Sequence, residues 1–149
     1  MSANTSPIWS GKPTIQWATA DGDGGTAGPI KTANTAKDGT GTVNTIFTAD
    51  ATNGSYVDRI RFRPAGTNAS ATVVRIFINN GSSSATPANN ILVDEYTCPT
   101  VTISETSSQV LLELPLQIGL PAGYKILVTI GTTIAAGLFV SAIGGHYTL

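Results

Sequence analysis

Apolar and polar residues alternate along most of the chain after residue 42, in short runs separated by turn sequences. The clearest run shares one parity over Val110, Leu112, Leu114, Leu116, Ile118 and Leu120. A period of two sustained this far predicts a strand with one face buried throughout. Pro115 falls on the opposite parity, which predicts an edge position or a bulge, where its missing N–H does no harm.

Seven further strands are expected over residues 14–18, 42–49, 56–63, 72–79, 91–98, 125–130 and 138–142. In the 56–63 run, Tyr56, Ile60 and Phe62 share one predicted face, and Val57 shares the other face with arginines. Apolar residues nowhere recur at helical spacing for three turns. About eight strands between turn signals predict an all-β protein, an antiparallel β-sandwich or jelly roll.

The first 41 residues have a different composition, rich in Gly, Thr, Ala, Asn and Pro and poor in large apolar side chains. They hold the short strand predicted at 14–18 and a Gly-dense stretch at 21–28 that is typical of a turn or loop. We expect residues 1–41 to form an extended N-terminal arm, ordered by a neighbour, and residues 42–149 to form the β-sandwich domain.

Charge is scarce: 11% of the 149 residues are charged, against about 25% in typical soluble proteins, and the formal net charge is −1. A neutral Thr/Ser/Asn/Gly surface suits an assembly better than a freely diffusing protein, although a neutral secreted β-domain has the same composition. A near-zero balance argues against binding to a phosphate backbone. The sequence shows no signal peptide and no apolar stretch of membrane-spanning length, so neither secretion nor a membrane partner is expected.

Each candidate catalytic or metal-binding site in the sequence lacks residues that its chemistry requires. His146 is the only histidine and Cys98 the only cysteine, so a dyad would require these two distant residues to meet. Asp94 and Glu95 are adjacent on a predicted strand and point to opposite faces, which prevents the cooperation that glycoside hydrolysis needs. The DGDGG run at 21–25 resembles the opening of a calcium loop but lacks the later ligands of that motif. We expect no enzyme activity, cofactor or metal.

Two groups of residues are candidates for binding a protein partner. Half of the eight cations lie at Arg59, Arg61, Arg63 and Arg75. The first three share one face of one predicted strand, which is either an ordinary solvated face or a docking site for a carboxylate-rich surface. Trp9 and Trp17 lie in the predicted arm, where they either anchor against a partner or pack on the chain's own core.

Four segments resemble a family of small proteins encoded among the head genes of tailed bacteriophages: residues 31–49 (KTANTAKDGTGTVNTIFTA), 56–68 (YVDRIRFRPAGTN), 73–81 (VVRIFINNG) and 113–133 (ELPLQIGLPAGYKILVTIGTT). These are strand and turn sequences rather than a chemical signature. The resemblance implies a capsid decoration (cement) protein, a β-sandwich module that is often trimeric and binds the major capsid protein on the outside of the head. It would be made in the host cytoplasm. The alternative is a carbohydrate- or receptor-binding module of a phage tail or fibre.

Overall fold

The computed structural model describes residues 12–20, 27–109 and 111–148. In these residues the chain forms nine strands, one three-residue 3₁₀-helix and no α-helix. The strands are β1 (Lys12–Trp17), β2 (Thr19–Ala20), β3 (Asn44–Thr48), β4 (Ser55–Pro64), β5 (Thr72–Asn79), β6 (Asn90–Cys98), β7 (Leu112–Leu120), β8 (Lys125–Ile130) and β9 (Leu138–His146), with the 3₁₀-helix η1 (Pro87–Asn89) before β6. The predicted all-β class is confirmed, and each predicted strand is present. The two-residue β2 was not predicted.

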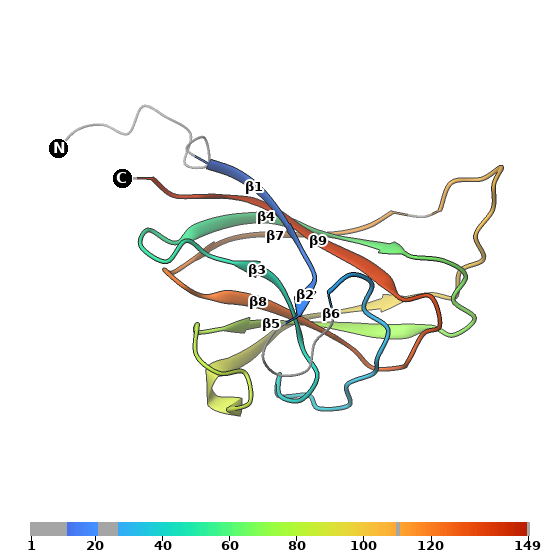
Figure 1. Cartoon of the computed structure of the whole chain (residues 1–149), viewed down its shortest axis with the longest axis horizontal. Coiled ribbons are helices and arrows are strands. Elements are labelled where there is room, and N and C mark those ends of the chain that lie inside the picture. The colour runs from blue at the N-terminus through green and yellow to red at the C-terminus, as the bar shows by residue number, and fades with distance from the viewer. Residues whose placement is uncertain (1–11, 21–26, 110, 149) are drawn as a thin grey trace.

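The strands form two antiparallel sheets, which Figure 1 shows as an upper and a lower layer. The first sheet has the order β1-β9-β4-β7, and the second has the order β2-β3-β8-β5-β6. The pairs β5–β6, β4–β7, β3–β8 and β1–β9 are nested around the β5–β6 connection and alternate between the two sheets. One long hairpin rolled up in this way is a jelly roll, so the fold is the second of the two predicted forms.

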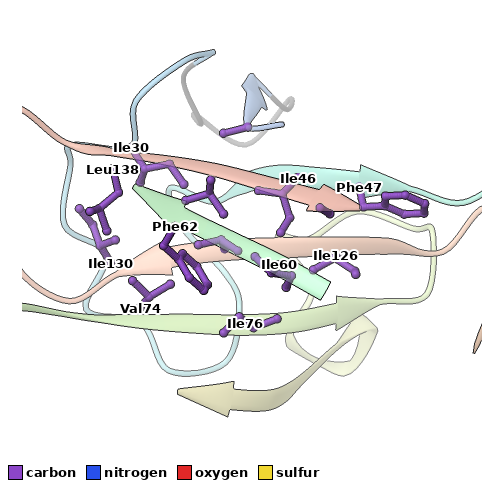
Figure 2. Packing of buried hydrophobic residues seen from close by; sticks show 14 of the residues in the cluster. Ile30, Ile46, Phe47, Ile60, Phe62, Val74, Ile76, Ile126, Ile130 and Leu138 are labelled. Atoms are coloured by element: carbon purple, nitrogen blue, oxygen red, sulfur yellow. The ribbon is translucent and has the colours of Figure 1, made fainter. Parts of the chain in front are cut away.

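The core lies between the two sheets and consists almost entirely of aliphatic and Phe side chains. Figure 2 shows Ile60 and Phe62 of β4 lying between the layers with Val74 and Ile76 of β5, and all four are fully buried. Phe62 also stacks on Tyr96 of β6, with ring centroids 6.0 Å apart. At about 25 cal/mol per Å² of buried apolar surface, this interior is the main source of stability.

A β-bulge in β4 corrects the predicted faces of this strand. The register shifts between Val57 and Arg59, so Val57 faces the core with Ile60, while Tyr56 is only half-buried. An extra residue at a bulge moves every earlier side chain to the other face, which strict alternation does not anticipate. Beyond the bulge, Arg59, Arg61 and Arg63 share the outer face as predicted.

Strand β7 lies at the edge of the first sheet and carries a bulge beside Pro115, as the proline predicted. Between Val57 and Arg59 of β4, the paired residue in β7 moves from Ile118 to Pro115, and Gln117 adopts a positive φ of 52°. The core-facing Leu112, Leu114, Leu116 and Ile118 are only half-buried, because an edge strand is covered on one side.

The described part of the predicted arm lies on the sandwich itself and pairs with strands of the same chain. Strand β1 pairs with β9 from Lys12 to Trp17, and Ile30 is 1% exposed and forms a bridge with Leu138. The backbone N–H of Asn34 donates to the Ile130 carbonyl at 2.7 Å. No division is visible at residue 42, because the backbone groups of these residues pair with strands of the same domain.

The segment 31–43, here called the covering segment, crosses the outer face of the second sheet. Asn34 lies against β8, and the Asp38 carbonyl accepts a hydrogen bond from Asn90 of β6 at 3.2 Å. At its end, Val43 joins Phe77 and Leu127 in a small apolar cluster separate from the main core. The covering segment therefore buries apolar side chains on the outer face of the second sheet.

Candidate docking surface

The outer face of the first sheet is not covered by any described segment and is here called the docking face. Its cross-strand pairs form a grid, because residues directly opposite each other in antiparallel strands place their side chains on the same side. One row joins Trp17, Ser141, Arg61 and Glu113, the next joins Ile15, Ile143, Arg59 and Pro115, and a third joins Phe139 and Arg63. The docking face thus contains Trp17 and three of the four predicted arginines.

Large apolar side chains occupy the β1 and β9 side of the docking face. Trp17 is 63% exposed, Ile15 is 60% exposed and Phe139 is 53% exposed. Phe139 is the diagonal neighbour of Trp17, which puts their Cα atoms about 7–8 Å apart. Side chains of this size exposed together on one sheet face mark an interaction surface better than scattered ones do.

Arg59 and Arg61 are held by carboxylates on the β4 and β7 side. Glu113 accepts from Arg59 Nη1 at 2.5 Å and from Arg61 Nε at 2.8 Å, and Arg59 Nε also donates to Asp58 at 2.5 Å. The hydrogen bonds from Arg61 and Arg59 lower the pKa of the Glu113 carboxyl. The hydrogen bonds to Asp58 and Glu113 raise the pKa of Arg59. Both guanidiniums therefore have compensating charges within the chain.

Arg63 differs from these two. It is exposed at the end of the arginine column and lies directly opposite Phe139 in the register. None of the ion pairs within the described part of the chain includes Arg63. Its guanidinium is the one in this column without a carboxylate partner among those residues.

Arg75 is separated from the other three arginines because β5 belongs to the second sheet. Its side chain is 12% exposed, bonds Glu95 at 2.8 Å and lies 3.4 Å from the Asn34 carbonyl of the covering segment. An arginine enclosed in this way stabilises the fold and has little surface left for a partner. Trp9, the other predicted anchor, lies outside the described residues.

A small hollow of about 180 Å³ lies at the base of β1, between the two sheets at their common edge. It is lined by Ile15, Gln16, Trp17, Thr45 and Thr48. The Gln16 amide spans this edge, because it donates to the Thr48 carbonyl at 3.1 Å and accepts from the Thr48 N–H at 2.8 Å. This two-bond contact ties β1 to β3 beside Trp17.

His146 ends β9 and is half-buried. Its Nδ1 lies 2.6 Å from Ser55 Oγ, which also accepts from the Asp50 N–H at 2.9 Å. Ser55 is 0% exposed, so its hydroxyl cannot reach a substrate. Two backbone hydrogen bonds, from Asn53 and then Thr52, lower the pKa of Asp50 and commit that carboxylate to the turn. The group fastens the β3–β4 turn to β9.

The remaining reactive groups are isolated in the described residues. Cys98 ends β6 in the second sheet, and burial raises the pKa of its thiol to about 11. No group of three or more His, Cys, Asp or Glu in the described residues could hold a metal ion. The DGDGG stretch at 21–25 lies outside those residues. No described helix is long and apolar enough to cross a membrane.

No family model, curated protein or solved structure matches the chain. The resemblance to phage decoration proteins therefore stays a prediction from the sequence motifs.

Sequence reasoning missed Ile15, Glu113 and Phe139 as members of the docking face. Phe139 stands on the parity opposite to the buried Leu138 and Val140, and an apolar residue at such a position is the signal that was available. Ile15 alternates only with half-buried Thr14 and Gln16, so its strand gave no such signal. The role of Glu113 depends on the pairing of β4 with β7, more than fifty residues apart in the chain. Local patterns carry no information about that pairing.

Proposed function

We propose that this chain is a structural protein of a virion, a decoration protein that binds the outer surface of a phage head through its docking face. The observation that carries the proposal is the grouping of exposed Trp17 and Phe139 with a column of arginines on one uncovered sheet. Trp and Arg are the residue types that dominate protein–protein binding energy when an interface buries them.

Two further features support this function. The chain has 11% charged residues and a net charge of −1, which favours association over free diffusion. The motifs at residues 56–68 and 113–133 resemble those of phage decoration proteins, and they supply β4 and β7, the arginine-bearing half of the docking face. Since one jelly-roll fold serves capsid and lectin domains alike, the fold by itself does not choose between them.

The test is the position and copy number of the chain in virions made from the genome that encodes it, determined by cryo-EM. We expect many regularly spaced copies on the shell, grouped as trimers around symmetry axes, with the docking face turned toward the major capsid protein. A paired variant, Trp17→Ala with Phe139→Ala, should be folded but missing from the shell. A few copies at one vertex or on the tail would contradict decoration.

A carbohydrate-binding module is the second candidate, favoured by the exposed rings of Trp17 and Phe139 on one flat sheet face. Sugar rings stack on exposed aromatic side chains, and two rings about 7–8 Å apart could contact neighbouring sugars. Glycan-array binding by the isolated protein that disappears in the Trp17→Ala and Phe139→Ala variants would favour this function. Binding to capsids without any glycan signal would exclude it.

A further inference from the structure

The three arginines of the docking face are not equivalent. Arg59 and Arg61 share Glu113, and Arg59 also holds Asp58, whereas Arg63 has no carboxylate partner within the described residues. Among the described residues, three guanidiniums against two carboxylates leave one positive charge uncompensated. That charge is at Arg63, which is exposed at the end of β4 nearest Phe139.

The surroundings of Arg63 would strengthen a contact between its guanidinium and a negative charge once a partner covers this part of the docking face. Phe139 lies directly opposite it in the register, and Trp17 is the diagonal neighbour of Phe139 on the next strand, so two large exposed side chains lie on the same sheet face as the guanidinium. A partner that covers these rings removes water from around Arg63, and the effective dielectric constant falls. A planar guanidinium presents paired N–H donors that match the two oxygens of a carboxylate.

We propose that Arg63 receives one carboxylate from a mainly apolar segment of the partner protein, while Phe139 and Trp17 contact the apolar side chains that flank this carboxylate. The inference rests on the proposed function, because it assigns the chemistry of the protein partner at the docking face. Glu113 limits the site to one carboxylate, because it already occupies Arg59 and Arg61.

The charge balance favours a protein carboxylate over a polyanion. A nucleic-acid backbone needs several uncompensated cations in a row, and the docking face offers one. The chain as a whole has a net charge of −1, so long-range attraction to a densely charged polymer is absent. A single carboxylate between apolar side chains matches both the charge and the rings.

The experiment uses the full chain with Trp9→Phe, which leaves Trp17 as the only tryptophan and therefore as the fluorescent reporter. The probe is a synthetic peptide with one aspartate between valines, and the comparison peptide has asparagine in its place. We expect the aspartate peptide to change Trp17 emission at lower concentration than the asparagine peptide. Arg63→Ala should weaken binding of the aspartate peptide by about tenfold, the effect of one lost charge-assisted contact.

Two variants make the test specific. Lys37→Ala removes the same charge from an exposed position on the covering segment, on the other sheet, and should leave binding unchanged. Glu113→Gln removes the carboxylate that occupies Arg59 and Arg61 and should strengthen binding of the aspartate peptide. Opposite effects of Arg63→Ala and Glu113→Gln would identify the competition for guanidiniums.

Equal binding of both peptides, or equal losses in Arg63→Ala and Lys37→Ala, would overturn the assignment of Arg63. Binding of a glucuronic-acid oligosaccharide that depends on Arg63, with no binding of the aspartate peptide, would overturn it in favour of a sugar carboxylate. The proposed function is tested separately by the Trp17→Ala and Phe139→Ala virions. If those variants leave the shell while Arg63→Ala stays bound, docking stands and only the carboxylate contact fails.

Discussion

Removing the guanidinium of Arg75 should destabilise the fold, whereas removing that of Arg63 should not. Methionine is the replacement in both, because it keeps much of the apolar stem and isolates the loss of the charged group. Arg75 is 12% exposed and joins Glu95 of β6 to the Asn34 carbonyl of the covering segment, so its loss affects two packed elements. Arg63 is exposed and has no such partners in the described residues.

The size of the effect follows from these contacts. Glu95 is 49% exposed, which reduces its ion pair with Arg75 to at most about 1 kcal/mol. The 3.4 Å contact with the Asn34 carbonyl is long and adds less than an average hydrogen bond. We therefore expect Arg75→Met to lower the free energy of unfolding by about 1–2 kcal/mol. An exposed substitution such as Arg63→Met should change it by no more than about 0.5 kcal/mol.

Thermal and urea unfolding followed by circular dichroism would measure the difference. For a chain of this size, about 1–2 kcal/mol lowers the Tm by roughly 2–8 °C. A loss in Arg63→Met that equals the loss in Arg75→Met would refute the division into structural and docking arginines. An Arg75→Met variant as stable as the parent would show that the covering segment is held without this residue.

Three other predictions concern single side chains. Thr129→Val should raise the free energy of unfolding by about 1 kcal/mol in urea titrations, because the buried Thr129 hydroxyl has no hydrogen-bond partner in the described residues; a loss of stability would mean that the hydroxyl is satisfied. Cys98, whose pKa burial raises to about 11, should react with iodoacetamide at pH 8 only after the protein is unfolded; rapid labelling of the folded protein would contradict its burial. The pKa of Glu113 is below its ordinary value of 4.5 in the folded state, so its stabilising contribution is present above that pH and is lost as the pH falls through the lowered pKa. Glu113→Gln should remove this part of the acid dependence, and acid titrations of parent and variant that run parallel would argue against the Arg61 and Arg59 contacts.

Strand positions could be predicted from the sequence because most strands have one buried face, and alternation reports that face directly. The predicted faces were wrong where a bulge inserts a residue, as at Asp58. Because of this bulge, Val57 faces the core in place of Tyr56. Nothing in the local pattern marks the bulge, because it is set by the pairing of β4 with both β7 and β9. Arg59, Arg61 and Arg63 were correctly predicted to share one face, because all three follow the bulge in the chain.

Residues 31–41 of the covering segment were predicted as part of the extended N-terminal arm, because that region is rich in Gly, Thr, Ala, Asn and Pro and poor in large apolar side chains. Its contribution is visible instead in the strands beneath it. β8 is buried at every residue from Ile126 to Ile130, and β5 buries Phe77 on the parity opposite to Val74 and Ile76. A strand with apolar residues on both parities requires a cover on both faces. That signal, in residues 72–79 and 125–130, indicated a second layer over the second sheet.

Three edge strands of the jelly roll, β7, β6 and β2, have features that hinder pairing with a strand of another chain. The β7 edge carries Pro115 and a bulge, and the β6 edge carries a bulge and Asp94, which lies opposite the core residue Ile76. Proline, bulges and inward-pointing charges are the features by which natural sheets prevent edge pairing. At the opposite side, β2 is two residues long, and Gln16 satisfies the Thr48 backbone near it.

With these edges protected and the second sheet covered, the docking face is a sheet face that a partner can reach without displacing any described segment. The outer face of the second sheet buries Phe77 and Leu127 beneath the covering segment, so a partner there would have to displace packed chain. The docking face needs no displacement, because Trp17 and Phe139 are already exposed and Glu113 already holds two guanidiniums in place. A preformed surface of this kind loses little conformational entropy on binding. The protection of the β7, β6 and β2 edges and the cover on the second sheet therefore support the same surface that the side chains indicate.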